Sequence, residues 1–249
     1  MKTYLLLALF IIWSEQLVAQ RSSQPSSLAK PAFETNSVAV FSPPSWLNET
    51  ILWKAAKSVE DQLEWDIRKI KVYWHKDNKE FQRFHGLGPS VRAVAVKKDE
   101  TVHLGPLVNK ENFSEVFKHE LAHIIMFQKY KQAIPPWLEE GLANFVSRDS
   151  NIDYKFLAKK TALPITSLTH PFGKNADSVY HYQASTAVMK MIAEKCSVTD
   201  LLQLSVGKKL ESYLKTYCQI DDLDASFRSW INQKARGGGE KKKKYWWSQ

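Results

Sequence analysis

Hydrophobic and polar positions follow one pattern in the first part of the chain and a different pattern after about residue 111. In the first part, short runs of β-branched and aromatic residues are bounded by proline, glycine or charged residues. Runs of this length and composition predict β-strands. The predicted strands cover residues 37–41, 70–74, 91–96 and 101–104, with the last two joined as a hairpin across the polar residues 97–100.

Apolar residues at helical spacing mark two segments among these strands and most of the chain beyond them. The early helices are predicted over residues 47–65 and 77–84. Later helices are predicted from starting points near Asn112, Pro136, Ile152, Ala176, Val198 and Asp221. Strands in one half and helices in the other predict an α+β fold. We expect a small N-terminal mixed or antiparallel sheet that carries a helix, followed by a mainly helical half.

The N-terminal end of the sequence predicts an exported protein. Lys2 is followed by ten apolar residues, 4–13, and residues 17–19 resemble a signal-peptide cleavage site that ends in a small residue. Ten residues rise only about 15 Å as a helix, which is too short to cross a bilayer, and no other run is long enough. We therefore expect residues 1–19 to be removed. The mature protein is expected to be soluble, secreted or periplasmic, and without a transmembrane segment.

The rest of the sequence predicts one globular domain with flexible ends. Residues 20–36 are rich in Ser, Pro and Gln and predict a flexible leader, residues 37–235 predict the domain, and residues 236–249 predict a basic disordered tail. The net charge of the 249-residue chain is +9, and four of its lysines lie in the tail. A diffuse excess of this size identifies no acidic partner, so we predict no specific nucleic-acid partner. The sequence indicates no oligomeric state.

Cys196 and Cys218 are the two cysteines of the chain. In an oxidising compartment they could form a disulfide, and two buried free thiols are equally compatible with the sequence. Two cysteines at this spacing do not predict a zinc finger or a disulfide-rich scaffold.

Three ionisable residues lie within five positions of the segment FKHELAHIIMFQKY, residues 117–130. On a helix, His119 and His123 project from one face, about 40° and 6 Å apart, which is close enough to bind one cation. Neutral imidazole nitrogen is a good zinc ligand, and H-E-x-x-H on a helix is the spacing that such a site needs. The surrounding apolar residues predict a buried helix, in which uncompensated polar groups would be costly. We therefore predict that both histidines bind Zn²⁺ and that Glu120 reaches a water on the metal.

A catalytic zinc site needs a third protein ligand and an open position. We predict that this ligand comes from PPWLEEGLANF, residues 135–145, where proline fits a helix start. Glu140 lies closer than Glu139 to the apolar face of this helix, so Glu140 is the predicted ligand. Glu139 is expected to be solvated at the helix N-terminus, which favours acidic residues. Asn144, one turn after Glu140, is predicted to hydrogen-bond the far nitrogen of a zinc-binding histidine.

The segments HELAH and WLEEGLANF together resemble the gluzincin zinc metallopeptidases. In its compact length the chain is most similar to the peptidase MA-like metallohydrolases of that group. Residues 180–192 and 214–231 are similar to further segments of the family. The resemblance implies a thermolysin-like catalytic core, a zinc cofactor and a peptide or protein substrate. No segment is similar to the amino-terminus-binding motif of aminopeptidases, and this absence argues against exopeptidase activity.

The resemblance also implies roles for individual residues. Glu140 corresponds to the third zinc ligand of the family and Glu120 to the general base. A tyrosine or histidine of the family stabilises the oxyanion, which makes Tyr180, His181 and Tyr182 candidates, with Tyr182 favoured. An extended peptide is expected to add as a further strand along the edge formed by residues 91–96.

These features predict an exported zinc-dependent metallopeptidase that hydrolyses peptide bonds. Two alternatives stay open from the sequence: a catalytically silent, metal-containing binding protein of the same fold, and a surface-adhesive protein that acts through its basic tail. The other histidines have no ligand partner at a useful spacing and are expected at the surface; they are His75, His85, His103 and His170.

Overall fold

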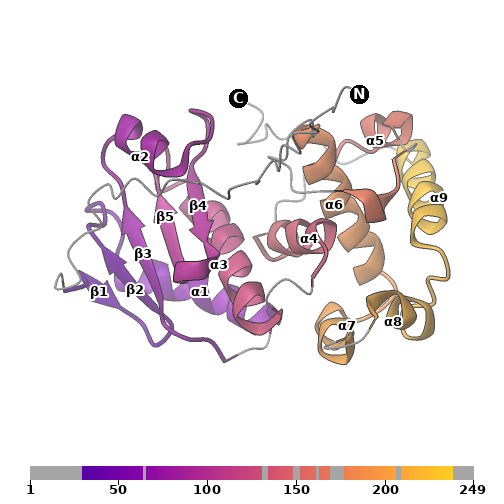
Figure 1. Ribbon diagram of the computed structural model, residues 1–249, viewed down its shortest axis with the longest axis horizontal. Helices are drawn as coiled ribbons and strands as arrows, with labels where there is room; N and C mark the ends of the chain where they lie inside the picture. The colour runs from indigo at the N-terminus through magenta and orange to yellow at the C-terminus, as the bar shows by residue number, and fades with distance from the viewer. Residues whose placement is uncertain are drawn as a thin grey trace, which may run out of the picture.

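The computed structural model describes residues 30–63, 66–130, 134–147, 152–160, 163–168, 177–205 and 209–237. The predicted signal peptide, most of the predicted leader, His170 and nearly all of the basic tail lie outside the described residues. Figure 1 shows a five-stranded sheet beside a mainly helical half, so the predicted α+β class is confirmed. Within the described ranges, no helix combines the length and the apolar character needed to span a membrane.

The sheet contains both parallel and antiparallel strand pairs. Its strands, in chain order, are β1 (Phe33–Glu34), β2 (Val38–Phe41), β3 (Ile70–Trp74), β4 (Ala93–Val96) and β5 (Thr101–Leu104). Their spatial order is β1-β2-β3-β5-β4, in which β2, β3 and β5 are parallel and the two edge strands are antiparallel to their neighbours. β4 and β5 form the predicted hairpin. β1 lies within residues 20–36, which were predicted to form a flexible leader, so that prediction is wrong at residues 33–34. A strand of two residues is too short to show a periodic pattern in the sequence.

One face of the sheet carries apolar side chains at alternate positions and packs on two helices. These side chains are fully buried, and burial stabilises each by roughly 1.5–3 kcal/mol; they belong to Val38, Val40, Ile70, Val72, Val102 and Leu104. The helices α1 (Glu49–Leu63) and α3 (Phe113–Tyr130) contribute to the same core and lie behind the sheet in Figure 1. This packing holds α3, which carries HELAH, against β4 and β5.

The short helix α2 (Asn78–His85) closes one end of the sheet, as Figure 1 shows. The Asp77 side chain caps it by accepting a hydrogen bond from the Glu80 amide at 2.7 Å. Gly86 ends it with a φ of 67°, a left-handed conformation that glycine adopts without steric cost. The helix predicted over residues 77–84 is confirmed.

In the helical half, α4 (Pro136–Ser147) lies between α3 and α6 (Ser178–Ala193). A Cβ atom at Gly141 would come 2.4 Å from the carbonyl oxygen of Ser185, so only glycine permits this close approach of α4 to α6. The further helices are α5 (Tyr154–Lys160), α7 (Val198–Ser205), α8 (Leu210–Thr216) and α9 (Leu223–Arg236). The sequence did not predict α8 as a helix separate from the one that starts near Val198.

A disulfide joins Cys196, which follows α6, to Cys218, which follows α8, with their Cα atoms 5.0 Å apart. The structure therefore selects the paired arrangement that the sequence left open. Closing a loop of this length stabilises a folded chain by about 3 kcal/mol in the chain-entropy model.

Candidate metal centre

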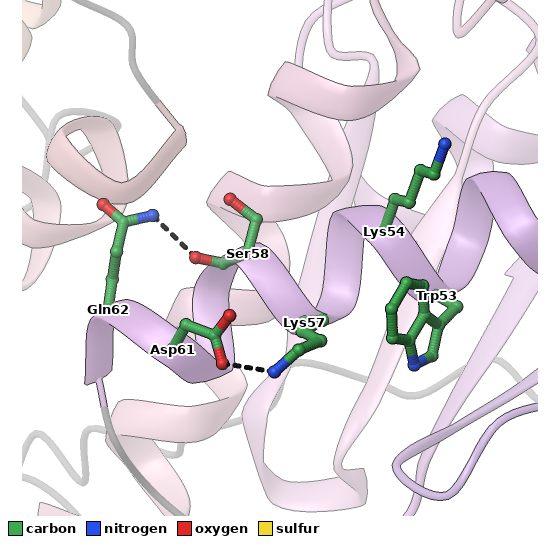
Figure 2. Close-up of a pocket in the computed structure, with 6 residues that line it drawn as sticks. All are labelled: Trp53, Lys54, Lys57, Ser58, Asp61 and Gln62. Atoms are coloured by element: carbon green, nitrogen blue, oxygen red, sulfur yellow. Dashed lines mark hydrogen bonds and ion pairs between the residues drawn. The ribbon is translucent and has the colours of Figure 1, made fainter.

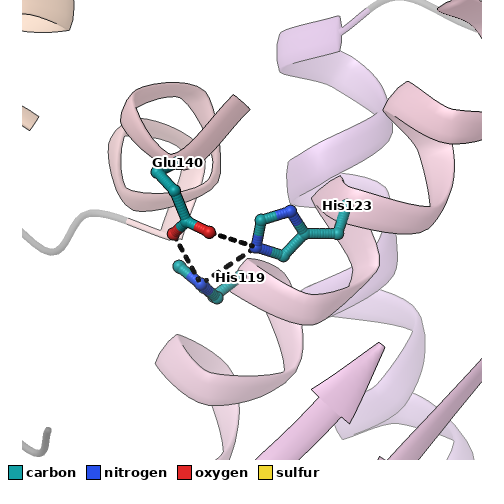
Figure 3. A group of neighbouring side chains, drawn as sticks. All are labelled: His119, His123 and Glu140. Carbon is teal, nitrogen blue, oxygen red and sulfur yellow. Dashed lines mark hydrogen bonds and ion pairs between the residues drawn. The ribbon is translucent and has the colours of Figure 1, made fainter. Parts of the chain in front are cut away.

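Three buried side chains from α3 and α4 meet at one point between the sheet and the helical half (Figure 3). The Nε2 atoms of His119 and His123 are 3.2 Å apart. Glu140 places Oε2 at 3.8 Å from the Nε2 atom of His119 and Oε1 at 3.7 Å from the Nε2 atom of His123. All three residues are at most 6 % exposed. The predicted grouping of the two histidines with Glu140 is confirmed.

The spacing of these three side chains fits a single metal ion. Zinc–nitrogen and zinc–oxygen bonds of about 2.1 Å in a tetrahedral arrangement separate the ligand atoms by roughly 3.4 Å. The observed separations of 3.2, 3.7 and 3.8 Å lie on both sides of that value. Two imidazole nitrogens and one carboxylate oxygen are also a donor set that binds divalent cations. The group can therefore hold a metal ion.

The acidic residues of this group favour positive charge at its centre. Burial raises the pKa of Glu140 to about 7, although His123 opposes the change. Burial lowers the pKa of His123, but Glu140 and Glu139 outweigh this effect and hold that pKa at about 9. Both directions mean that the carboxylates favour positive charge at this group, which a metal ion would supply after any bound proton has left.

Glu120 lies beside the three-residue group and contacts the sheet. It is 6 % exposed, and burial raises its pKa. The backbone N–H of Ala95 in β4 donates a hydrogen bond to its carboxylate, which partly offsets the effect of burial, as do the charges of His123 and Lys97. Glu120 is therefore held between the edge strand and the three candidate ligands without belonging to their group.

The side chain that binds the far nitrogen of His123 is Glu139. Its Oε1 atom is 2.8 Å from the Nδ1 atom of His123 and 2.5 Å from the Nζ atom of Lys97. Burial raises the pKa of Glu139, but these two partners outweigh it and hold the pKa at about 2. The prediction that Glu139 is solvated is wrong, because α4 packs with this residue turned toward α3 and the end of β4.

Asn144 does not make the contact that was predicted for it. Its amide nitrogen donates to the Oγ1 atom of Thr186 at 2.7 Å, and its side-chain oxygen is buried without a hydrogen-bond partner among the described residues. It lies on the side of α4 that packs on α6, so its polar atoms face Thr186 instead of a histidine ring.

The two candidate tyrosines of α6 point in different directions. The rings of Tyr182 and His119 have centroids 6.3 Å apart. Tyr182 therefore lies beside the candidate metal-binding group, which consists of His119, His123 and Glu140. Tyr180 is completely buried, and its hydroxyl has no hydrogen-bond partner in the described part of the chain. Burial raises the pKa of Tyr180, and Asp224 and Asp177 add to this effect. Residues two positions apart on a helix are separated by about 200° around its axis, which explains why only one of the two tyrosines faces the site.

A second pair of histidines lies on the sheet, outside the metal-binding group. The Nδ1 atom of His103 is 3.0 Å from the Nε2 atom of His75, and its Nε2 atom is 3.0 Å from the Oγ1 atom of Thr101. The ring of Phe84 stacks on His103 with centroids 4.1 Å apart. His103 is 6 % exposed, so the prediction of a surface position is wrong for it. Burial lowers the pKa of His103 to about 3, with a smaller contribution from His75.

A shallow hollow of about 370 Å³ lies on the outer side of α1 (Figure 2). Lys57 and Asp61 form an ion pair at 2.6 Å there, and the Gln62 side chain donates to the Ser58 carbonyl oxygen at 2.7 Å. These polar groups satisfy one another along a single helix and do not converge on a common point. The metal-binding group is therefore the stronger candidate for a functional site.

No protein-family model matches this chain, and no curated protein matches it.

Proposed function

We propose that this protein is an exported zinc metallopeptidase of the gluzincin type with a thermolysin-like catalytic core. The observation that carries the proposal is the position of Glu120, a buried carboxylate beside a group of two histidines and a glutamate. Such a donor set suits zinc and leaves room for a fourth ligand. A separate carboxylate next to it is the arrangement that hydrolysis by an activated water needs.

The residues of the site divide the chemistry between them. A zinc ion held by His119, His123 and Glu140 would supply Lewis acidity toward a water and toward the carbonyl of a peptide bond. Glu120 takes the proton of that water and returns it to the leaving amine nitrogen. A carboxylate suits this role, because the group must bind the proton and then release it.

The neighbouring elements bind and orient the substrate in this proposal. β4 is an edge strand, and an extended peptide can add to such an edge through backbone hydrogen bonds. Ala95 connects this strand to Glu120, so a peptide along β4 would lie next to the base. Tyr182, whose ring lies beside His119, is the candidate donor to the oxyanion.

The change Glu120→Gln tests the proposal. It keeps the size of the side chain and removes its basicity, so we expect peptide hydrolysis to fall by roughly 10²- to 10⁴-fold. Zinc content should be unchanged. The measurement is cleavage of a peptide library by the purified mature chain, with and without a chelator, alongside metal analysis. Glu111→Gln, at an exposed position just before α3, is the matched control and should retain activity.

Two results would count against the proposal. Full turnover by the Glu120→Gln protein would exclude Glu120 as the base. A parent protein that binds zinc but cleaves no peptide would favour the catalytically silent, metal-containing binding protein.

A further inference from the structure

The ring of His123 is held from outside the metal-binding group by a chain of two charged residues. Lys97 begins the turn η1 (Lys97–Asp99) that follows β4, and its Nζ atom is 2.5 Å from the Oε1 atom of Glu139. The same oxygen is 2.8 Å from the Nδ1 atom of His123. One carboxylate oxygen therefore contacts an ammonium group on one side and an imidazole on the other.

Burial increases along this chain from the surface to the metal-binding group. The exposed fraction of the side chain is 34 % at Lys97, 18 % at Glu139 and 8 % at His123. An ion pair at the protein surface is weakened by solvent and contributes little. The contact between Glu139 and His123 is better shielded, and it lies where an electrostatic interaction is stronger.

The hydrogen bond to Glu139 determines what the other nitrogen of His123 can do. A neutral imidazole that donates its Nδ1 hydrogen to a carboxylate has its lone pair on Nε2. That Nε2 atom points to the group, 3.2 Å from His119 and 3.7 Å from Glu140. Carboxylate partners of this kind fix the ring orientation of a metal ligand and raise its basicity.

The same strand reaches the site at a second position. Ala95 donates its backbone N–H to Glu120, and Lys97, two residues later, binds Glu139. β4 contacts the proposed base, and the residue that directly follows β4 contacts the residue that orients a proposed ligand.

We propose that Lys97 and Glu139 are positioning residues, in which Lys97 holds the Glu139 carboxylate and Glu139 holds the His123 ring with Nε2 toward the metal. This inference rests on the proposed metal centre. The residue at the end of β4, the edge strand along which the substrate is proposed to bind, then also influences the affinity of the protein for its metal.

The experiment measures the zinc affinity of the mature full-length chain by competition with a chromophoric chelator. Glu139→Ala removes the acceptor, so zinc affinity should fall roughly 10- to 100-fold, as for other partners of metal-binding histidines. Glu139→Gln keeps an acceptor and Lys97→Met keeps the carboxylate, so both should have smaller losses. Lys97→Arg should restore the affinity of the parent. Lys98→Met, at the exposed neighbouring position, is the matched control and should leave the affinity unchanged.

The absorption spectrum of the cobalt-loaded proteins provides a second measurement. A change in ring orientation alters the ligand field, so the visible bands of Glu139→Ala should shift, whereas loss of a merely structural contact would leave them in place. If Glu139→Ala does not fold, the zinc affinities and cobalt spectra of Lys97→Met and Lys97→Arg are compared instead.

The outcomes separate this inference from the proposed function. A folded Glu139→Ala protein with the zinc affinity and the cobalt spectrum of the parent would overturn the positioning role and leave the metal centre intact. A parent protein that binds neither metal would overturn both.

Discussion

Among the residues that the structure describes, two pairs of histidines have ring nitrogens that are almost equally close. In the metal-binding group, His119 and His123 approach to 3.2 Å from successive turns of α3. On the sheet, His75 and His103 approach to 3.0 Å, where His75 directly follows β3 and His103 lies in the neighbouring β5. His103 is buried to the same degree as His123. Ring spacing therefore does not distinguish the two pairs, and burial distinguishes them only at His75, which is half-buried.

The two pairs differ in the charge of their neighbours. Burial lowers the pKa of His123, but the carboxylates of Glu140 and Glu139 raise it to about 9. His103 faces the ring of Phe84, the hydroxyl of Thr101 and a second imidazole, and burial lowers its pKa to about 3. The acidic neighbours therefore favour positive charge on His123, whereas burial disfavours it on His103. The same difference decides which pair can bind a metal ion.

Removal of the acid from the first pair should have the largest effect. Glu140→Gln leaves the size of the side chain and removes its charge. We expect zinc affinity to fall by more than about 100-fold, because loss of a partner outside the ligand set already costs roughly 10- to 100-fold. Chelator competition measures this change, and Glu211→Gln at an exposed site is the control. Zinc affinity equal to that of the parent would show that the histidines do not need this acid.

The second pair should make stability depend on pH. His103 has a pKa of about 3 in the folded protein and about 6.5 when unfolded, so between these values the unfolded chain binds the extra proton. The contribution of His103 to the free energy of unfolding should therefore be fully retained above pH 6.5. This contribution should fall by about 1.4 kcal/mol for each pH unit below pH 6.5, which amounts to about 2 kcal/mol at pH 5.

Urea unfolding of the parent and of His103→Gln between pH 7 and pH 5 isolates this contribution, because all other groups are common to both proteins. The difference in stability between the two should shrink as the pH falls. Parallel stability curves would mean that His103 binds a proton equally well in the folded and unfolded chains.

An acid added to the second pair should make it resemble the first. Thr101→Asp places a carboxylate within reach of His103, since the present hydroxyl is 3.0 Å from its Nε2 atom. An opposite charge at this range raises the pKa of a histidine by at least about one. Titration of the ring proton by NMR measures the change, and Thr101→Asn, which adds no charge, is the control. A pKa that is the same in both proteins would mean that burial alone governs this position.

Local spacing was sufficient to predict the parts of the site that lie within one helix. The four-residue interval between His119 and His123 places both rings on one face of α3, and the apolar residues around them predicted its burial. Glu140 was predicted because it lies nearer than Glu139 to the apolar face of α4. The predicted strands β2, β3 and β5 followed in the same way from runs of apolar residues.

Contacts between residues distant in the sequence could not be predicted by spacing. Glu139 meets Lys97 across 42 residues, and His103 meets His75 across 28. Each contact depends on how a helix or a strand is rotated against its neighbour, which periodicity does not specify. Rotation of this kind also turns Asn144 toward Thr186 and determines which of Tyr182 and Tyr180 faces the site.

The tight contact between α4 and α6 also limits the site, although Gly141 carries no side chain at all. Because a single methyl group there would collide with the Ser185 carbonyl, any replacement must displace α4, and Glu140 is the adjacent residue on that helix. Glu140 would then move away from His119 and His123 without a change to any atom of these three side chains. Substitution of Gly141 is limited by the space available for one carbon atom. Substitution of Glu140 is limited by the need for a negative charge.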